Sequence, residues 1–435
     1  MTDLVRNTAA VILAGGKGTR LDPLTRGICK PALPFGAAYR SIDFSLANCV
    51  HSGIRTVGVA TQYEPRDLHD HLEDVWGSAF RARGVSISRW FAGEANEGAG
   101  YLGTAHAVYG NLHRIEQLDD RMLLVLAGDH VYRMDYGPLL EQHRRRGASV
   151  TIACVEVPRS QMRHFGIMSV SARDRIDAFV EKPTTSAEVP GCDGSRVLAS
   201  MGIYVFDGAQ LRRALAADAR AAGSRHDFGR DVLPRLIDSG RAFAYEFRRP
   251  AGGAPEYWRD IGTLDAYWQA HMELLGQSPH LSLDDPEWPL PAPSGAPRLV
   301  EGAVTTRRGG RVENSLVASD CSVSGSVRDS VVFGGVDVRG RAQVAESVIL
   351  PGAVIGEGSR LRGVIVDSRC RVMPGTIVER STAHDAVAAR PEPPVLTTDS
   401  NALGLDGRKL SVARAVGALM VCDLSAWSGL AAGFV

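Results

Sequence analysis

The stretch Ala9-Ala10-Val11-Ile12-Leu13-Ala14-Gly15-Gly16-Lys17-Gly18-Thr19-Arg20-Leu21 decides the fold of the N-terminal part of this chain. Its first five residues form an apolar run, which predicts a buried strand, and the glycines after it predict a loop. Similar apolar runs at residues 56–60, 122–127 and 149–155 alternate with helix-like segments such as 139–146. We therefore expect an α/β, Rossmann-like domain with a mostly parallel sheet, whose site lies beyond the carboxyl ends of its strands.

The glycine-rich loop has the chemistry of a phosphate-binding loop. Glycine lets backbone N–H groups approach a phosphate without a Cβ clash. Lys17, Arg20 and Lys30 add cations for a polyanionic ligand. The loop lacks the Gly-Lys-Ser/Thr ending of a P-loop and the Gly-x-Gly-x-x-Gly of nicotinamide-binding proteins. A plain turn with solvated cations is the alternative.

Four charged residues stand at the ends of further strand-like segments. Asp129 follows the apolar run 122–127, and Asp260 lies in Trp258-Arg259-Asp260-Ile261-Gly262. A carboxylate at a strand end is well placed to hold Mg²⁺ on a nucleotide, although an aspartate there is more often a turn or cap residue. Nothing in the spacing proves that Asp129 and Asp260 meet. In Glu181-Lys182-Pro183, the lysine suits a sugar phosphate and the glutamate suits sugar hydroxyls, with a surface ion pair as the alternative.

The pattern changes in the last third of the chain. Residues 278–299 form a proline-dense linker without an apolar period. Aliphatic residues then recur every six positions, as Val332, Val338 and Val344, Val348 and Val354, Ile355 and Leu361, and Val366, Val372 and Val378. A longer echo recurs at Ser315, Ser330, Ser347 and Gly363. Two periods that agree predict a parallel β-helix, with a β-sandwich as the alternative.

These observations divide the chain into four predicted segments. They are a catalytic domain over residues 1–277, a linker over 278–299, a hexapeptide-repeat domain over 300–380, and a tail of unknown role over 381–435. The repeat region contains no histidine, which disfavours a hexapeptide acyltransferase, because those enzymes need a catalytic base.

Composition excludes other classes of function. The chain has 435 residues, with 49 Lys+Arg against 49 Asp+Glu, and this balance argues against a general nucleic-acid binder. Its seven cysteines are widely spaced with no Cys-x-x-Cys, which disfavours disulfides or zinc and favours a cytoplasmic protein. No signal peptide is apparent and no apolar run is long enough to cross a bilayer, so we expect no membrane partner.

Over roughly residues 8–380 these motifs closely resemble the ADP-glucose pyrophosphorylase (glucose-1-phosphate adenylyltransferase) family. The loop motif is shared by all sugar-nucleotide pyrophosphorylases. Three segments are specific to the ADP-glucose branch: Ser200-Met201-Gly202-Ile203-Tyr204, His226-Asp227-Phe228-Gly229 and Tyr257-Trp258-Arg259-Asp260. The resemblance implies a left-handed β-helix, a homotetramer, and the reaction ATP + α-D-glucose 1-phosphate ⇌ ADP-glucose + pyrophosphate, which feeds glycogen (α-glucan) synthesis.

The resemblance also implies roles for single residues. The catalytic residues would be Arg20, Lys30, Asp129 and Asp260, of which the two aspartates would hold Mg²⁺. The residues around ATP would be Leu13, Ala14, Gly15, Gly16, Gly18, Thr19, Gln62, Tyr101, Gly103 and Thr104. Those around glucose 1-phosphate would be Gly166, Glu181, Lys182 and Ser200.

Four positions depart from the family pattern. Gly27 and Ile28 stand where the family usually has basic residues that bind sugar-phosphate activators. Gly100 replaces a tryptophan, and His106 replaces an aspartate near the nucleotide. We therefore expect altered allosteric control. A catalytically silent regulatory subunit, or a pyrophosphorylase for another base or sugar, remains as an alternative.

Overall fold

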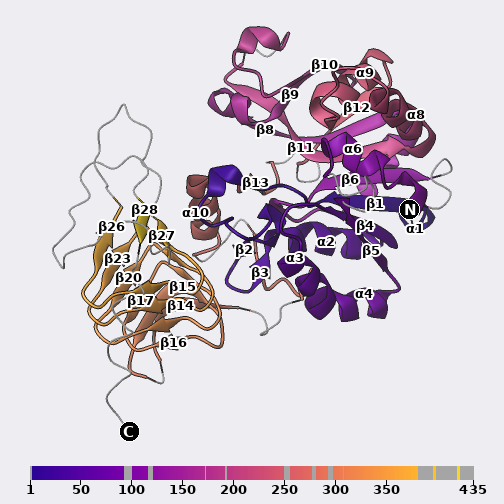
Figure 1. Cartoon of the computed structure of the whole chain (residues 1–435). Coiled ribbons are helices and arrows are strands. Elements are labelled where there is room, and N and C mark those ends of the chain that lie inside the picture. The colour runs from indigo at the N-terminus through magenta and orange to yellow at the C-terminus, as the bar shows by residue number, and fades with distance from the viewer. Residues whose placement is uncertain are drawn as a thin grey trace. The chain divides into compact units, whose positions relative to one another are not determined.

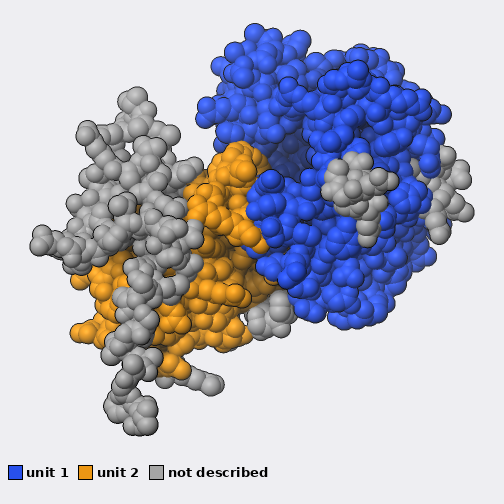
Figure 2. All heavy atoms as spheres, in the orientation of Figure 1, with its two compact units in different colours: residues 1–17, 28–32, 41–258 blue, residues 18–27, 33–40, 259–435 orange. Residues whose placement is uncertain are grey.

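The computed structural model describes residues 2–92, 100–115, 121–171, 173–191, 194–248, 255–276, 281–291, 297–306, 308–380, 395–397 and 419–421. The chain forms two compact units (Figure 2). Unit 1 comprises residues 1–17, 28–32 and 41–258, and unit 2 comprises residues 18–27, 33–40 and 259–435. Most of the predicted tail at 381–435 lies outside the described residues. The four-segment division of the chain stays a prediction.

Unit 1 is built on a nine-stranded sheet in which β10-β9-β11-β6-β1-β4-β5 are neighbours and β8 pairs with both β11 and β12 (Figure 1). Strands β1, β4, β5 and β6 run parallel to one another, whereas β11 runs antiparallel to β6, β8 and β9. The predicted α/β fold with a mostly parallel sheet is confirmed. The glycine-rich loop follows β1, which lies between two parallel neighbours, β4 and β6. The strands are β1 (Thr8–Leu13), β4 (Thr56–Thr61), β5 (Ser86–Phe91), β6 (Met122–Ala127), β8 (Val150–Pro158), β9 (Gly166–Val170), β10 (Ile176–Glu181), β11 (Arg196–Asp207) and β12 (Ala242–Glu246).

Helices cover both faces of this sheet, which explains why its strands are apolar without alternation. In β1, Ala9 and Val11 belong to a core cluster shared with helices α6, α8 and α9, while Ala10 and Ile12, which point the opposite way, are also fully buried. The helices of unit 1 are α1 (Thr2–Arg6), α2 (Ser41–Ser52), α3 (Arg66–His71), α4 (Gly77–Arg83), α6 (Thr104–Tyr109), α7 (Gly137–Arg146), α8 (Gly208–Ala219) and α9 (Leu233–Asp238). Among the described residues, no helix is long and apolar enough to cross a membrane.

Unit 2 contains the predicted hexapeptide-repeat domain, a coil of short parallel strands consistent with a left-handed β-helix (Figure 1). Three stacks of parallel pairs run along it: β15-β18-β21-β24, β16-β19-β22-β25 and β17-β20-β23-β26. The strands are β14 (Arg298–Thr305), β15 (Arg311–Val317), β16 (Ser322–Val323), β17 (Ser326–Arg328), β18 (Val331–Val332), β19 (Asp337–Val338), β20 (Gln343–Ala345), β21 (Val348–Ile349), β22 (Val354–Ile355), β23 (Arg360–Arg362), β24 (Ile365–Val366), β25 (Arg371–Val372), β26 (Ile377–Glu379), β27 (Val395–Thr397) and β28 (Leu419–Val421).

The register of the β-helix corrects two details of the sequence pattern. Val348 pairs with Ile365, seventeen positions on, so one step in that coil is five residues rather than six. The first coil is shorter still, since Leu316 pairs with Val331, fifteen positions on. The cluster of residues inside the coil accordingly contains Ile349 and Ile355. Val348 is fully buried outside that cluster, and Val354 is partly exposed. The serine echo is also shifted by one at its end, because the N–H of Val364, not Gly363, donates to Ser347 Oγ at 3.2 Å.

Helix α10 (Leu264–Met272) packs on the β-helix within unit 2. Trp268 Nε1 donates to the Glu346 carbonyl at 2.8 Å, and the Arg380 guanidinium lies 4.6 Å from the Trp268 ring centroid. Arg380 also pairs with Asp265 at 2.6 Å. These contacts anchor the segment that begins just after Asp260.

Candidate functional site

The glycine-rich loop leaves the sheet where β1 is flanked on both sides by parallel strands. The N–H of Ala14 donates to the Ala60 carbonyl, and the N–H of Gly128 donates to the Leu13 carbonyl. Gly15 lies against Gln62, because a Cβ at Gly15 would stand 3.1 Å from Gln62 Cβ. The expected loop therefore sits at the carboxyl end of the strands, where α/β sheets bind ligands.

Lys30 and Asp129 meet beside this loop. Lys30 Nζ lies 2.7 Å from Asp129 Oδ2, and the lysine side chain is 9% exposed. The N–H of Lys30 donates to the Gly16 carbonyl at 3.0 Å, which ties the lysine to the loop. Burial alone raises the pKa of the Asp129 carboxyl, but the Lys30 ammonium and the His130 imidazole outweigh it and hold that pKa well below its usual range. Asp129 is therefore a carboxylate at neutral pH.

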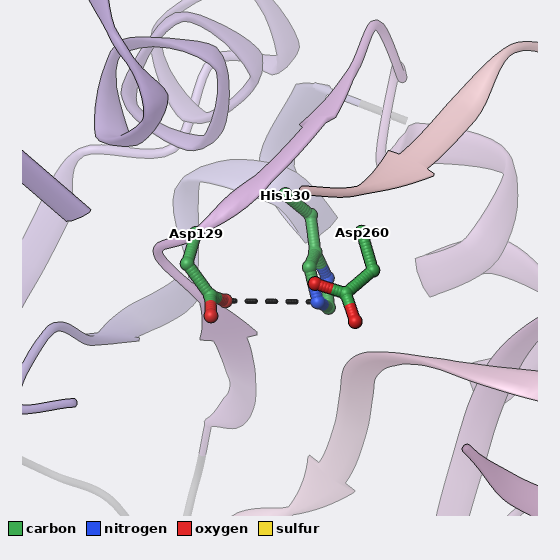
Figure 3. Close-up of side chains that lie close together, drawn as sticks. All are labelled: Asp129, His130 and Asp260. Atoms are coloured by element: carbon green, nitrogen blue, oxygen red, sulfur yellow. Dashed lines mark ion pairs between the residues drawn. The ribbon is translucent and has the colours of Figure 1, made fainter. Parts of the chain in front are cut away.

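His130 was not predicted as a site residue, yet it lies beside Asp129. Its Nε2 is 3.6 Å from Asp129 Oδ1, the ion pair drawn in Figure 3. Its Nδ1 lies 2.9 Å from the Met201 carbonyl, which can only accept, so Nδ1 carries a proton and Nε2 faces the carboxylate. The signal in the sequence was its place directly after Asp129 at a strand end.

Asp260 ends strand β13 (Trp258–Asp260), which begins with the last residue of unit 1. Trp258 packs edge-on against His130, with ring centroids 5.0 Å apart, and β13 pairs with β7 (His130–Tyr132). In unit 2, a Cβ at Gly262 would stand 2.8 Å from Asp260 Oδ1 and 2.9 Å from Arg20 Nη2. Within unit 2, the side chains of Arg20 and Asp260 therefore both lie beside Gly262.

Glu181 ends strand β10 and Lys182 directly follows it, where the resemblance implies the sugar phosphate. Lys182 Nζ lies 3.2 Å from Glu181 Oε1, and the Lys182 N–H donates to the Phe165 carbonyl at 2.9 Å. A Cβ at Gly166 or at Gly229 would stand 2.8 or 2.6 Å from Glu181 Oε2. Both glycines therefore make room for the carboxylate. Gly229 was not predicted as a site residue, although it closes one of the branch-specific motifs.

Ser200, the fourth residue expected near the sugar, turns its hydroxyl to the backbone of its own strand. Its Oγ accepts from the Gly202 N–H at 3.2 Å and lies 3.4 Å from the Tyr204 hydroxyl. Ser200 is buried.

Four residues outside the loop are expected around the nucleotide, and the structure places them in two groups: Gln62 with Tyr101, and Gly103 with Thr104. Gln62 Oε1 accepts from the Tyr101 N–H at 3.2 Å, and the Tyr101 hydroxyl is 2.9 Å from Asn111 Nδ2 in the core. Thr104 Oγ1 donates to Asp227 Oδ2 at 3.0 Å and accepts from the Phe228 N–H. A Cβ at Gly103 would stand 2.3 Å from the His226 carbonyl oxygen, so this position requires glycine.

Two of the four departures from the family pattern lie among these residues. A Cβ at Gly100 would stand 2.5 Å from Gln62 Nε2, so a larger residue there would force Gln62 to move. His106 Nδ1 accepts from the Leu102 N–H, and burial followed by the nearby His226 ring lowers the pKa of His106. A neutral imidazole therefore stands where the family has a carboxylate.

Comparisons with known proteins show the family of the chain. The sequence model of the nucleotidyl transferase family matches residues 9–277, and that of the GlmU-like C-terminal hexapeptide family matches residues 297–391. Glucose-1-phosphate adenylyltransferase 2 of Alkalilimnicola ehrlichii is 45% identical over 386 residues, which cover 88% of this chain and 91% of that protein. Glucose-1-phosphate adenylyltransferases of Methylococcus capsulatus and Methylobacillus flagellatus are 44% and 43% identical, over 88% and 86% of this chain and 90% and 89% of theirs. The chain therefore belongs to the glucose-1-phosphate adenylyltransferase family of nucleotidyl transferases.

Proposed function

We propose that this chain is a glucose-1-phosphate adenylyltransferase, which makes ADP-glucose and pyrophosphate from ATP and α-D-glucose 1-phosphate for glycogen synthesis. The observation that carries the proposal is the Lys30–Asp129 pair, 2.7 Å apart, in which a buried lysine meets a partly exposed carboxylate at the glycine-rich loop. A cation and a carboxylate held there suit a ligand that carries a triphosphate and a metal ion. The names of the relatives support the choice of ATP and glucose 1-phosphate.

The reaction needs no covalent enzyme intermediate, because the attacking sugar phosphate is already an anion. One of its oxygens attacks the α-phosphorus of ATP, and the bond to the bridging oxygen of pyrophosphate breaks in line with it. Catalysis then consists of holding the two substrates in this geometry and neutralising the charge that passes to pyrophosphate. Lys30 and Arg20 supply that neutralisation.

Asp129 and Asp260 are the residues that we propose to hold Mg²⁺, which when bound supplies positive charge to the triphosphate. Asp129, His130 and Asp260 each offer one ligand atom, and Figure 3 labels them. The donor set fits a hard cation, since both carboxylates provide oxygen. Trp258 packs on His130, and the two residues from Trp258 to Asp260 span at most about 7 Å of extended chain, which supports a shared role.

The two substrates are assigned to separate groups of residues. For ATP they are the loop residues Leu13, Ala14, Gly15, Gly16, Gly18 and Thr19, with Gln62, Tyr101, Gly103 and Thr104 beside them. For glucose 1-phosphate, Lys182 would bind the phosphate, and Glu181, Ser200 and Gly166 would border the sugar. Two glycines, Gly166 and Gly229, leave room for the Glu181 carboxylate, whose oxygens can accept hydrogen bonds from sugar hydroxyls.

Three further features belong to the same proposal. We propose that the enzyme works in the cytoplasm as a homotetramer and that its allosteric control is altered. Gly27 and Ile28 motivate the last point, because neither offers a charge to a sugar-phosphate activator.

Phosphorus NMR of the reaction mixture tests the proposed function. With purified protein, Mg²⁺, ATP and glucose 1-phosphate, the spectrum should gain the resonances of ADP-glucose and pyrophosphate together. Conversion of ATP to ADP and phosphate without ADP-glucose would contradict the proposal. No conversion, combined with binding to a second pyrophosphorylase chain, would favour a silent regulatory subunit.

A further inference from the structure

Helix α2 carries a buried polar stripe that the proposed mechanism does not use. Ser41, Ser45, Asn48 and Ser52 follow one another at helical spacing, and the first three are fully buried. Each of these side chains hydrogen-bonds backbone groups outside the helix. Serine in the middle of a helix usually bonds its own helix or faces water. The stripe therefore ties one helix to other segments of the chain.

The first residue of the stripe contacts the segment that carries Lys30. Ser41 Oγ lies 3.2 Å from the Lys30 carbonyl and 3.1 Å from the Pro31 carbonyl. The hydroxyl has one proton, which the two carbonyls share. Because Ser41 is 0% exposed, no water replaces this contact.

The next residue of the stripe, one turn along, contacts the segment that carries Asp129. Ser45 Oγ donates to the Ala127 carbonyl at 3.0 Å, two residues before Asp129. The Tyr132 hydroxyl lies 3.5 Å from Ser45 Oγ. Ser45 therefore contacts one residue before and one residue after Asp129 in the chain. Ser45 is also 0% exposed.

We infer that Ser41 and Ser45 are positioning residues, which set Lys30 and Asp129 at their working distance by holding both segments to one rigid helix turn. The inference rests on the proposed function. Lys30 and Asp129 are 99 positions apart in the chain, and the sheet fixes only the second of them. Side chains four apart on a helix keep a constant separation, so α2 acts as the common reference for both.

The test compares Ser41→Ala and Ser45→Ala with Ser52→Ala. Ser52 is the control, because its hydroxyl also bonds a backbone group outside the helix, accepting the Tyr136 N–H at 2.8 Å, and it stands at the opposite end of α2 from Ser41. All three variants should lose similar thermal stability. We expect kcat to fall at least tenfold in Ser41→Ala and Ser45→Ala, since misplacement by about 1 Å can cost 10²-fold, and to stay near wild type in Ser52→Ala.

Two readouts separate positioning from general loosening of the fold. The KM for glucose 1-phosphate should not change, because Glu181 ends β10 and Lys182 follows it, whereas Ser41 and Ser45 bond the segments of Lys30 and Asp129. Ser45→Thr keeps the hydroxyl but adds a methyl group to a packed core, so it should be less stable than wild type and still recover most of kcat.

The outcomes are distinct. Equal loss of kcat in all three alanine variants, or no recovery in Ser45→Thr when its fold is intact, would overturn the inference. An active wild type with unchanged kcat in Ser41→Ala and Ser45→Ala would also overturn it and leave the proposed function standing. A wild type without adenylyltransferase activity would instead contradict the proposed function. The melting temperatures of Ser41→Ala and Ser45→Ala would still report the loss of the two buried hydrogen bonds.

Discussion

Lys30 Nζ and Asp129 Oδ2 lie 2.7 Å apart, although the two residues are 99 positions apart in the chain. Lys30 comes from a short helical turn after the glycine-rich loop, and Asp129 comes from the end of β6. Their contact joins the two motifs that the proposed chemistry needs most. The predictions below start from this pair and move outward.

Asp129→Asn should lower kcat by at least about a hundredfold, a typical loss when one charged group is removed from a catalytic site. The amide keeps the volume and offers an oxygen to Lys30, so the fold should survive with a modest loss of stability. Steady-state kinetics and thermal unfolding of the same preparation check both points. Asp320→Asn, an exposed aspartate of the β-helix, is the control and should behave as wild type. Turnover near wild type in Asp129→Asn would exclude the metal assignment.

Gly229→Ala should raise the KM for glucose 1-phosphate by roughly tenfold, about the value of one good hydrogen bond, and leave the KM for ATP unchanged. The reason is that the new Cβ would stand 2.6 Å from Glu181 Oε2 and displace the carboxylate. Gly340→Ala, where a Cβ meets nothing within 4 Å, controls for the substitution itself. A larger change in the KM for ATP than in that for the sugar would mean that Glu181 does not border the sugar.

Falling pH should destabilise the fold through two buried histidines, His143 and His271. Burial lowers the pKa of His143 to about 4 and that of His271 to about 4. A folded pKa below the ordinary value means that the unfolded chain binds more protons as pH falls from about 6.5 to about 4, so stability is lost across that window. Each residue can contribute up to roughly 3 kcal/mol by its pKa shift.

Urea unfolding of wild type and His271→Gln between pH 7 and pH 5 checks this window. The wild type should lose stability more steeply with falling pH than the variant, which has no imidazole to protonate. His113→Gln is the control, because His113 is exposed and its removal should leave the wild-type slope. Parallel slopes for wild type and His271→Gln would refute the assignment.

Fructose 1,6-bisphosphate should stimulate turnover only weakly, less than the roughly fivefold lower end of typical allosteric coupling. Gly27 and Ile28 provide no charge for its phosphates, and a Cβ at Gly27 would meet nothing within 4 Å. Initial rates with and without the effector, at subsaturating ATP, provide the measurement. A many-fold rise in rate would show that the enzyme keeps a working activator site built from other residues.

Much of the fold was predictable because it repeats a simple pattern. The apolar runs identified the parallel strands β1, β4 and β6 but not β5, and the six-residue period identified the β-helix. The five-residue step from Val344 to Ile349 was not predictable, because adjacent aliphatic residues such as Val348 and Ile349 hide which of the two points inward.

The site was predictable only as separate pieces. Strand ends and loop glycines marked Lys30 and Asp129 as candidates, but their contact depends on how α2 and the sheet pack, which spacing does not encode. Gly229 was not predictable for a similar reason, because its role depends on its approach to Glu181, which is distant in the chain.

The central claim is that this chain transfers the adenylyl group of ATP to glucose 1-phosphate at the Lys30–Asp129 site. The most direct test is pyrophosphate release by the purified chain with Mg²⁺, glucose 1-phosphate and, in separate reactions, ATP, UTP, GTP, CTP and dTTP, without effector. We predict release with ATP alone, and its loss in Asp129→Asn. Release only with another nucleotide, or none with any of the five, would contradict the account.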